Sequence, residues 1–141
     1  MSAKPRTMNI KNRVAQDAQM LAHLGIGVDA DVLEGFDGRK PLLYLDVGSQ
    51  MVNALEFCHG GVVYALADTA CAYALGADDF APATVDASVT YLKPGRLGER
   101  LWAHTEVLRQ SSRLGTCEVR VLNPNQELVL VYRGTCANAA R

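Results

Sequence analysis

The sequence predicts an α+β domain in which an antiparallel sheet curls around one long buried helix. Residues 62–75 are apolar almost all round and are interrupted only by Asp68 and Thr69, which is typical of a helix buried on every side. Several later segments alternate apolar and polar residues, as half-buried strands do, and the short turns between them favour antiparallel neighbours. Because such a helix must bury its whole surface, we expect the sheet to wrap around it.

The remaining elements can be placed in order along the chain. Residues 11–24 are expected to form a leading helix, and residues 29–40 a turn region around one short strand. Period-two alternation predicts strands over residues 43–47, 84–91, 101–108 and 117–121. In the second of these, the alternation places Thr84 and Val85 on opposite faces. Residues 128–136 are apolar on both faces until Arg133, which indicates a central strand.

Composition and charge exclude several classes of protein. The chain has 141 residues, 49% of them hydrophobic, and a formal net charge of −1, so a disordered chain is excluded. Its 14 basic residues nearly balance 15 acidic ones, which gives no indication of a nucleic-acid or membrane-surface partner. The chain contains neither an apolar run of about 20 residues that could span a bilayer nor an apolar N-terminal stretch typical of a secretory signal. Four cysteines without a C-x-x-C pair support neither a zinc site nor a disulfide scaffold, so we expect a soluble cytoplasmic protein.

The carboxylate of Asp68, in the middle of the apolar helix, is the most informative feature of the sequence. An unpaired buried charge costs several kcal/mol, and no basic residue lies three or four positions away on either side. One alternative is that Asp68 faces a solvent gap. The apolar surroundings favour a functional carboxylate.

The same helix is preceded by His59 and begins at Gly60 and Gly61. Glycines at a helix start leave backbone N–H groups accessible, and the helix dipole favours a developing negative oxygen there, as in an oxyanion hole. Gly60 and Asp68 are eight residues apart, which is about 12 Å along a helix. One carbonyl cannot touch both groups. If both act on one substrate, Asp68 must come from a second subunit, and the protein must be a dimer with shared sites.

Two segments carry a family resemblance: NALEFCHGGVVYALADTA (residues 53–70) and TVDASVTYLKP (residues 84–94). Together they resemble the hotdog-fold acyl-CoA thioesterases, and within these the bacterial thioesterases of phenylacetic-acid degradation. The resemblance extends over about residues 17–136. It implies a hotdog fold whose central helix covers about residues 60–77, in a single domain over residues 28–141. An N-terminal extension and the leading helix would occupy residues 1–27.

The resemblance implies a role for each of five residues. Asp68 matches the catalytic carboxylate, which either activates water or attacks the thioester carbonyl, and Thr84 matches a small hydroxyl residue that places the water. Gly60 matches the glycine whose N–H polarises the thioester oxygen, while His59 and Asn53 match residues that order this loop and help to hold substrate or water. The residues alone leave other roles open, because His59 could cap the helix and Asn53 could fix its own loop. Such enzymes share their sites across a dimer, commonly pair dimers into tetramers, and need no metal or cofactor.

The expected activity is hydrolysis of an arylacetyl-CoA, such as phenylacetyl-CoA or a ring-hydroxylated relative. Lys93 and Arg96, in the turn after residues 84–91, are the candidates for contacts with the CoA phosphates. One alternative is a hotdog dehydratase, which usually places a catalytic histidine on the helix or its approach, whereas this sequence has Asp68. A second is a non-catalytic acyl-CoA-binding module, against which the intact Asp68 argues.

Overall fold

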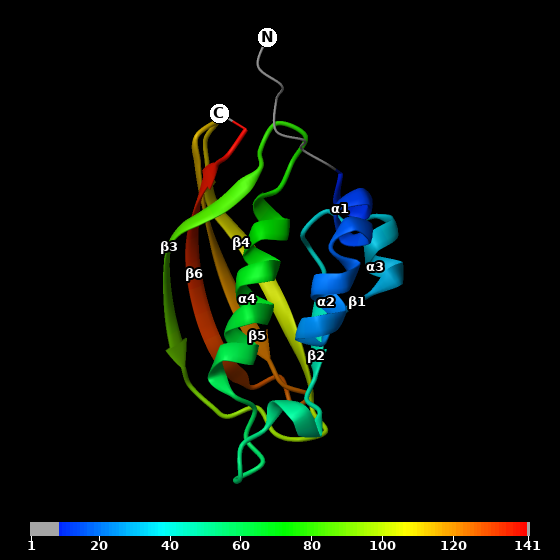
Figure 1. The fold of residues 1–141 in the computed structure, drawn as a ribbon. Helices are drawn as coiled ribbons and strands as arrows, with labels where there is room; N and C mark the ends of the chain where they lie inside the picture. Colours follow the sequence, from blue (N-terminus) through cyan, green and yellow to red (C-terminus); the bar gives the residue numbers. More distant parts are fainter. Residues whose placement is uncertain (1–8, 141) are drawn as a thin grey trace.

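The structure is a computed structural model that describes residues 9–140, so the predicted extension before Asn9 lies outside the described residues. The elements, in chain order, are α1 (Ile10–Gln16), α2 (Ala18–Leu24), β1 (Ile26–Val28), α3 (Ala30–Glu34), β2 (Leu43–Asp46), a 3-10 turn (Ser49–Met51), α4 (Gly60–Leu75), β3 (Pro82–Tyr91), β4 (Arg100–Gln110), β5 (Leu114–Leu122) and β6 (Leu128–Asn138). Figure 1 shows α4 lying along the inner face of the sheet, with α1, α2 and α3 gathered beside β1 and β2.

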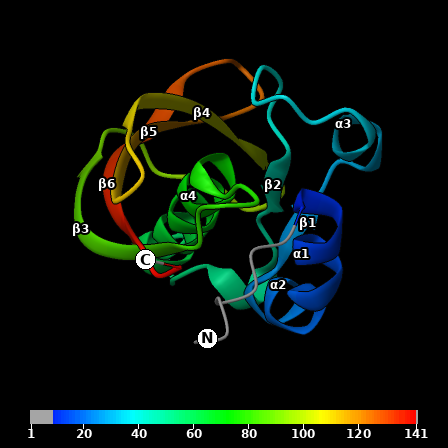
Figure 2. The ribbon, with the colours of Figure 1, turned by 90° about the horizontal axis from the view of Figure 1, so that it is seen from above.

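The strands form one antiparallel sheet in the order β1-β2-β4-β5-β6-β3. Seen from above, the sheet curls around α4, which confirms the predicted fold class (Figure 2). β6 pairs with β5 on one side and β3 on the other, so its prediction as a central strand is confirmed. β3 forms an edge of the sheet, because it pairs only with β6 among the described strands.

The N-terminal region differs from the prediction in two places. The single helix predicted over residues 11–24 is two helices, because Asp17 leaves the helical conformation at ψ 2° and its carboxylate accepts a hydrogen bond from the Tyr73 hydroxyl over 2.6 Å. The turn region predicted over residues 29–40 contains α3, whose first backbone N–H groups are capped by the Asp29 carboxylate. The short strand expected within residues 29–40 does not form; β1 lies just before this region.

The central helix is buried on the side that faces the sheet. Its buried residues are Val63, Leu66, Ala67, Ala70, Cys71, Tyr73 and Leu75. The prediction of burial on every side is wrong for the single chain, because Gly61 is exposed and Ala65, Asp68 and Ala72 are only half-buried. The helix also ends at Leu75 rather than Ala77, since Gly76 adopts an extended conformation there.

All four cysteines are buried and unpaired, as expected for small apolar side chains in a core. Cys71 lies on α4, Cys117 on β5 and Cys136 on β6, so three of the thiols lie between the helix and the sheet. Cys58 lies just before the start of α4. The core therefore extends under the whole length of the helix.

Candidate active site

Asp68 is held by two hydroxyl groups that come from the sheet. The Tyr132 hydroxyl on β6 donates to Asp68 Oδ1 over 2.5 Å, and the Thr84 hydroxyl on β3 donates to the same oxygen over 3.2 Å. Among the described residues, no group donates to Asp68 Oδ2. A carboxylate in an apolar helix needs a polar partner, and for Asp68 this partner is a pair of hydroxyl groups rather than a cation. One carboxylate oxygen is fixed, and the other is available for chemistry.

Tyr132 is a site residue that the sequence analysis missed. Its side chain has no solvent-exposed surface, and its ring lies edge-on to Tyr64 with the centroids 5.4 Å apart. Burial raises the pKa of the Tyr132 phenol, and the hydrogen bond to Asp68 raises it further. The phenol therefore stays protonated and donates. A signal was present in the sequence, because a phenol in an apolar strand and a carboxylate in an apolar helix each need a polar partner.

A β-bulge at Val85 directs Thr84 toward Asp68. Thr84 lies opposite Cys136, but Asp86 lies opposite Thr135, so Val85 is an extra residue in β3. The Thr84 hydroxyl is also 3.7 Å from the buried Cys136 sulfur. Simple alternation had placed Thr84 on the face opposite Val85 and Ala87. The bulge instead turns Thr84 toward the helix and leaves Val85 62% exposed.

The start of α4 provides an unoccupied backbone donor. His59 is the N-cap residue, and its Nδ1 atom accepts a hydrogen bond from the Gly61 N–H over 2.9 Å. The imidazole proton is thereby assigned to Nε2, which can donate outward. No described residue accepts a hydrogen bond from the Gly60 N–H, which lies at the positive end of the helix dipole. The predicted oxyanion donor is therefore free to bind a ligand.

Two further residues shape the region around Gly60. The Tyr91 hydroxyl donates to the Gly60 carbonyl over 2.9 Å, and a Cβ atom added at Gly60 would meet the Tyr91 ring at 3.0 to 3.2 Å. Sequence reasoning also missed Tyr91, which stands at the end of β3 without a distinguishing pattern. Asn53 Oδ1 accepts hydrogen bonds from the Leu55 and Phe57 backbone N–H groups, over 2.9 and 3.2 Å. Asn53 thus orders its own loop, and its side-chain amide N–H₂ group is left exposed.

The structure brings the predicted residues together in two groups rather than one. Thr84 joins Asp68 near the middle of α4, whereas His59 lies beside Gly60 at its start and Asn53 lies in the loop that leads into the helix. The groups are separated by eight residues of one straight helical segment, which is about 12 Å. The single chain therefore keeps the two groups of predicted site residues apart.

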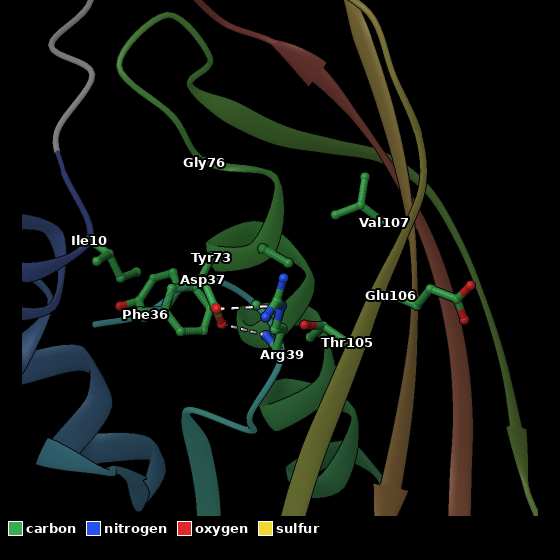
Figure 3. Close-up of a pocket in the computed structure, with 11 residues that line it drawn as sticks. Ile10, Phe36, Asp37, Arg39, Tyr73, Gly76, Thr105, Glu106 and Val107 are labelled. Atoms are coloured by element: carbon green, nitrogen blue, oxygen red, sulfur yellow. Dashed lines mark hydrogen bonds and ion pairs between the residues drawn. The ribbon is translucent and has the colours of Figure 1, made fainter. Parts of the chain in front are cut away.

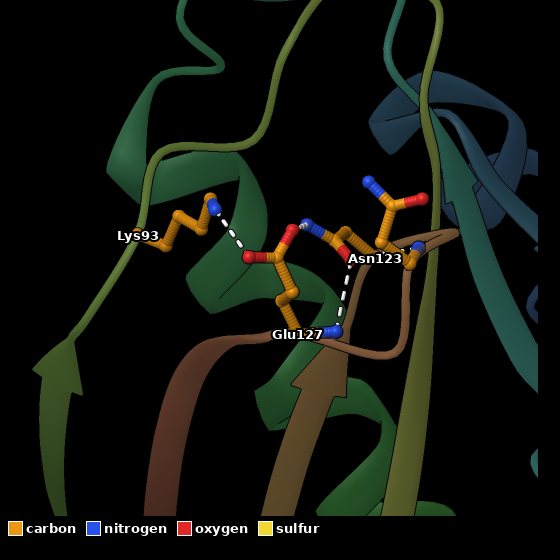
Figure 4. A network of polar contacts seen from close by, with 4 residues as sticks. Lys93, Asn123 and Glu127 are labelled. Atoms are coloured by element: carbon orange, nitrogen blue, oxygen red, sulfur yellow. Dashed lines mark hydrogen bonds and ion pairs between the residues drawn. The ribbon is translucent and has the colours of Figure 1, made fainter.

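Lys93 and Arg96, the two predicted phosphate ligands, lie in different surroundings. The Lys93 ammonium is paired with Glu127 over 2.5 Å, and Glu127 also accepts a hydrogen bond from the Asn123 amide over 3.2 Å (Figure 4). These contacts hold the pKa of Glu127 below its usual value, and the hydrogen bond from Lys93 makes the largest contribution. The Arg96 guanidinium lies 5.0 Å from the centre of the Phe57 ring and makes no ion pair among the described residues. Arg96 is therefore the less engaged of the two cations.

Of two cavities in the described chain, one is lined by predicted site residues and the other is not. A cavity of about 310 Å³ lies at the start of α4 and is lined by both Gly60 and Lys93. Its apolar walls include Val63, Leu92 and Val129. A larger one, of about 540 Å³, lies between α1, the end of α4 and β4, and none of the predicted site residues lines it (Figure 3). Only the smaller of these two cavities is continuous with a predicted donor.

The described residues contain no cluster of three or more His, Cys, Asp or Glu side chains that could hold a metal ion. Within the same part of the chain, no helix is long and apolar enough to cross a membrane.

Comparison with known proteins identifies the family. The family model of the thioesterase superfamily matches residues 55–130. The acyl-coenzyme A thioesterase PaaI of Escherichia coli is 33% identical over 110 residues, which cover 77% of this chain and 76% of that protein. The structure of the Escherichia coli PaaI protein from the phenylacetic acid degradation operon superposes with a TM-score of 0.79 and 27% identity, over 92% of this chain and 90% of that one. A mutant structure of the phenylacetic acid degradation protein PaaI from Thermus thermophilus superposes with a TM-score of 0.69 and 25% identity, over 85% and 98% of the two chains.

The family resemblance and the hotdog fold expected from the sequence are thus confirmed. The matched region contains the helix, the strand with Thr84 and the turn that follows it. The chain belongs to the thioesterase superfamily and is a thioester hydrolase.

Proposed function

We propose that the protein hydrolyses an arylacetyl-CoA, such as phenylacetyl-CoA, at two equivalent sites that are shared between the subunits of a homodimer. The observation that carries this proposal is the presence of an anchored carboxylate, Asp68, and an unoccupied helix N-terminal donor, Gly60, about 12 Å apart on one helix. The acyl-CoA substrate is supported by the similarity to the Escherichia coli acyl-coenzyme A thioesterase. The aryl group is supported by the structural similarity to a protein from the phenylacetic acid degradation operon.

The chemistry follows from these two groups. Attack on a thioester carbonyl places negative charge on its oxygen, and the fixed Gly60 N–H at the positive end of α4 stabilises that charge. Asp68 acts through its Oδ2 atom in one of two ways. It either takes a proton from a water whose oxygen bonds to the carbonyl carbon, or bonds to that carbon itself to form an anhydride that water then cleaves. In both cases the carbon–sulfur bond breaks, and CoA leaves as a thiolate that takes up a proton.

The neighbouring side chains complete the proposed site. Thr84 lies beside Asp68, and because its hydroxyl proton is donated to Asp68, its oxygen can accept a hydrogen bond from the attacking water. The outward Nε2–H of His59 and the free amide of Asn53 face away from the hydrogen bonds that fix them, so both can contact substrate or water. Their observed capping and loop-ordering contacts are compatible with these roles, because each uses only one side of the side chain.

A second subunit is needed because one carbonyl cannot contact both groups. Donor and carboxylate must each lie within about 3 Å of the reacting atoms, whereas helix rise separates them by about 12 Å. β3 leaves one edge without a strand partner and exposes Val85, and α4 is only half-buried at Ala65, Asp68 and Ala72. Two chains that pair along this edge around a twofold axis bring the start of each helix toward the middle of the other. The family resemblance extends this proposal to a homotetramer in the cytoplasm.

The surroundings of Gly60 suit the CoA moiety of the proposed substrate. The 310 Å³ cavity beside Gly60 has apolar walls that suit the pantetheine arm or the acyl group. Arg96 is the stronger candidate for a phosphate contact, since Lys93 would first have to release Glu127. Arg96 forms an isolated β-bridge with Phe57, and Lys93 lines the same cavity as Gly60, so both cations belong to the region around the start of α4.

A turnover assay tests the activity. Purified protein is incubated with phenylacetyl-CoA, and the released CoA is measured with a thiol-reactive dye. We expect catalytic release of one thiol per phenylacetate formed, with acetyl-CoA as the comparison substrate. Binding without thiol release would indicate an acyl-CoA-binding module. Loss of water from a 3-hydroxyacyl-CoA, with the thioester left intact, would indicate a dehydratase.

Complementation tests the shared site. Chains with Asp68→Asn or Gly60→Ala are each expected to be nearly inactive. When they are unfolded and refolded together, about half of the dimers are mixed, and each mixed dimer has one intact site and one doubly altered site. About a quarter of the wild-type activity should therefore return. If mixed dimers are verified by mass and no activity returns, both groups act within one subunit and the shared-site proposal is wrong.

A further inference from the structure

We infer that Tyr132 is a positioning residue that fixes Asp68 by its Oδ1 atom and so presents Oδ2 to the reacting thioester or water. This inference rests on the proposed role of Asp68. It concerns a residue of the buried sheet that would not touch the substrate. Its contribution would be to select one orientation of the carboxylate.

The contact geometry supports this role. The Tyr132 hydroxyl donates to Asp68 Oδ1 over 2.5 Å, which is shorter than the 3.2 Å hydrogen bond from Thr84 to the same oxygen. The terminal torsion of an aspartate is broad and nearly twofold, so an unanchored carboxylate can exchange its two oxygens. A short hydrogen bond from a fixed donor removes this freedom. Because Tyr132 belongs to a central strand, the anchor is part of the rigid core.

Charge supports the same role. Burial and the nearby carboxylate both raise the pKa of Tyr132, so the phenol remains a neutral donor. A phenol that donates to an ionised carboxylate forms a charge-assisted hydrogen bond, which is roughly twice as strong as a neutral one. The bond therefore holds Asp68 Oδ1 with a donor that keeps its proton, and Oδ2 stays directed at the reacting atoms.

The glycine at position 134 is an independent observation that the sheet makes room for this phenol. A Cβ atom built on Gly134 would lie 2.6 Å from both Cε1 and the hydroxyl oxygen of Tyr132. The Tyr132 ring is fully buried and packed against Tyr64, so it could not move aside freely. The absence of a side chain two residues further along β6 thus allows the phenol to reach Asp68.

The main test is Tyr132→Phe, which keeps the ring and removes the hydroxyl. We expect kcat to fall about tenfold, which is the scale of one hydrogen bond to a charged group, with KM changed less than twofold. Tyr73→Phe is the matched control, because Tyr73 is also a buried phenol that donates to a carboxylate, that of Asp17, over 2.6 Å. The control should lose stability to a similar degree and keep its kcat. A normal kcat in Tyr132→Phe, or an equal loss in Tyr73→Phe, would overturn the inference.

A double-mutant cycle separates positioning from a structural effect. If Tyr132 acts through Asp68, Tyr132→Phe should not lower the residual kcat of Asp68→Asn any further. Independent, multiplicative losses would contradict the inference. The same variants distinguish failure of this inference from failure of the proposed function. Full activity in Asp68→Asn refutes the role of Asp68. An inactive Asp68→Asn together with a fully active Tyr132→Phe refutes only the role of Tyr132.

A second variant covers the case in which Tyr132→Phe does not fold. Gly134→Ala keeps the hydroxyl but displaces the ring, so kcat should fall at least fivefold in protein that retains its fold by circular dichroism. Folded Gly134→Ala with unchanged kcat would show that the position of the phenol is immaterial.

Discussion

Replacing Thr84 by valine tests the contribution of the bulged strand to activity. Valine keeps the branched shape of threonine and removes only the hydroxyl that donates to Asp68 Oδ1. O–H···O hydrogen bonds are typically about 2.7–2.8 Å long, so the 3.2 Å bond from Thr84 is a long one. Its loss should cost less than the loss of a full charge-assisted hydrogen bond. We expect the activation free energy to rise by about 1 kcal/mol, which corresponds to a fivefold lower kcat. Any loss beyond this value would measure the proposed placement of water by Thr84.

The assay compares kcat with the free energy of unfolding. Thr84 is exposed in the single chain, so the substitution should change stability by less than about 0.5 kcal/mol. Thr90→Val is the matched control, because Thr90 is exposed on the same strand and lies away from Asp68. The control should retain wild-type kcat. If Thr84→Val keeps its kcat within a factor of two while Asp68→Asn is inactive, the hydroxyl has no part in the reaction.

Three further predictions concern other parts of the chain. Gly60→Ala should lower kcat by about a hundredfold, because the added methyl group meets the Tyr91 ring at 3.0 Å and crowds the approach to the N–H; normal steady-state kinetics would contradict the oxyanion role. Arg96→Ala should raise KM severalfold for phenylacetyl-CoA but not for a phenylacetyl thioester of a short thiol that lacks phosphates, and an equal change for both would exclude a phosphate contact. Burial lowers the pKa of His104 below its ordinary 6.5, so the stability it contributes is present above pH 6.5 and is lost as the pH falls through the folded-state pKa. His104→Gln should therefore flatten the urea-midpoint curve between about pH 7.5 and 5, and an unchanged slope would show that His104 is not responsible.

The sequence was sufficient to predict the central helix and the position of its carboxylate. An alanine-rich, apolar run that contains one acidic residue is a strong local signal, and the eight-residue distance to Gly60 follows directly from helix geometry. The capping role of His59 was one of two possibilities from the sequence, and the structure shows the capping hydrogen bond. These features depend on neighbours in the chain, which is why the sequence revealed them.

The missed features depend on contacts between distant segments. Tyr132 reaches Asp68 across 64 residues of sequence, and its hydroxyl is indistinguishable from that of any core tyrosine until the helix and sheet are placed. The bulge at Val85 changes the face of Thr84 without changing the composition of the strand. The break at Asp17 likewise reflects a carboxylate drawn to Tyr73 on another helix. Period-two and period-3.6 patterns contain no information about such contacts.

The four buried thiols are built-in probes of local opening, because the rate at which they react reports how often the fold opens. Burial raises the pKa of Cys58 to about 11, and a contact with Cys117 together with burial raises that of Cys71 to about 12. Because only an accessible thiolate reacts quickly, the cysteines of the folded chain should not react with the thiol dye during the turnover assay that measures released CoA. Slow alkylation of these cysteines, followed over hours, would then measure the rate of local opening of the native state. Cys136, whose sulfur is 3.7 Å from the Thr84 hydroxyl, would report opening near Asp68, and Cys58, which lines the cavity beside Gly60, would report opening at the start of α4.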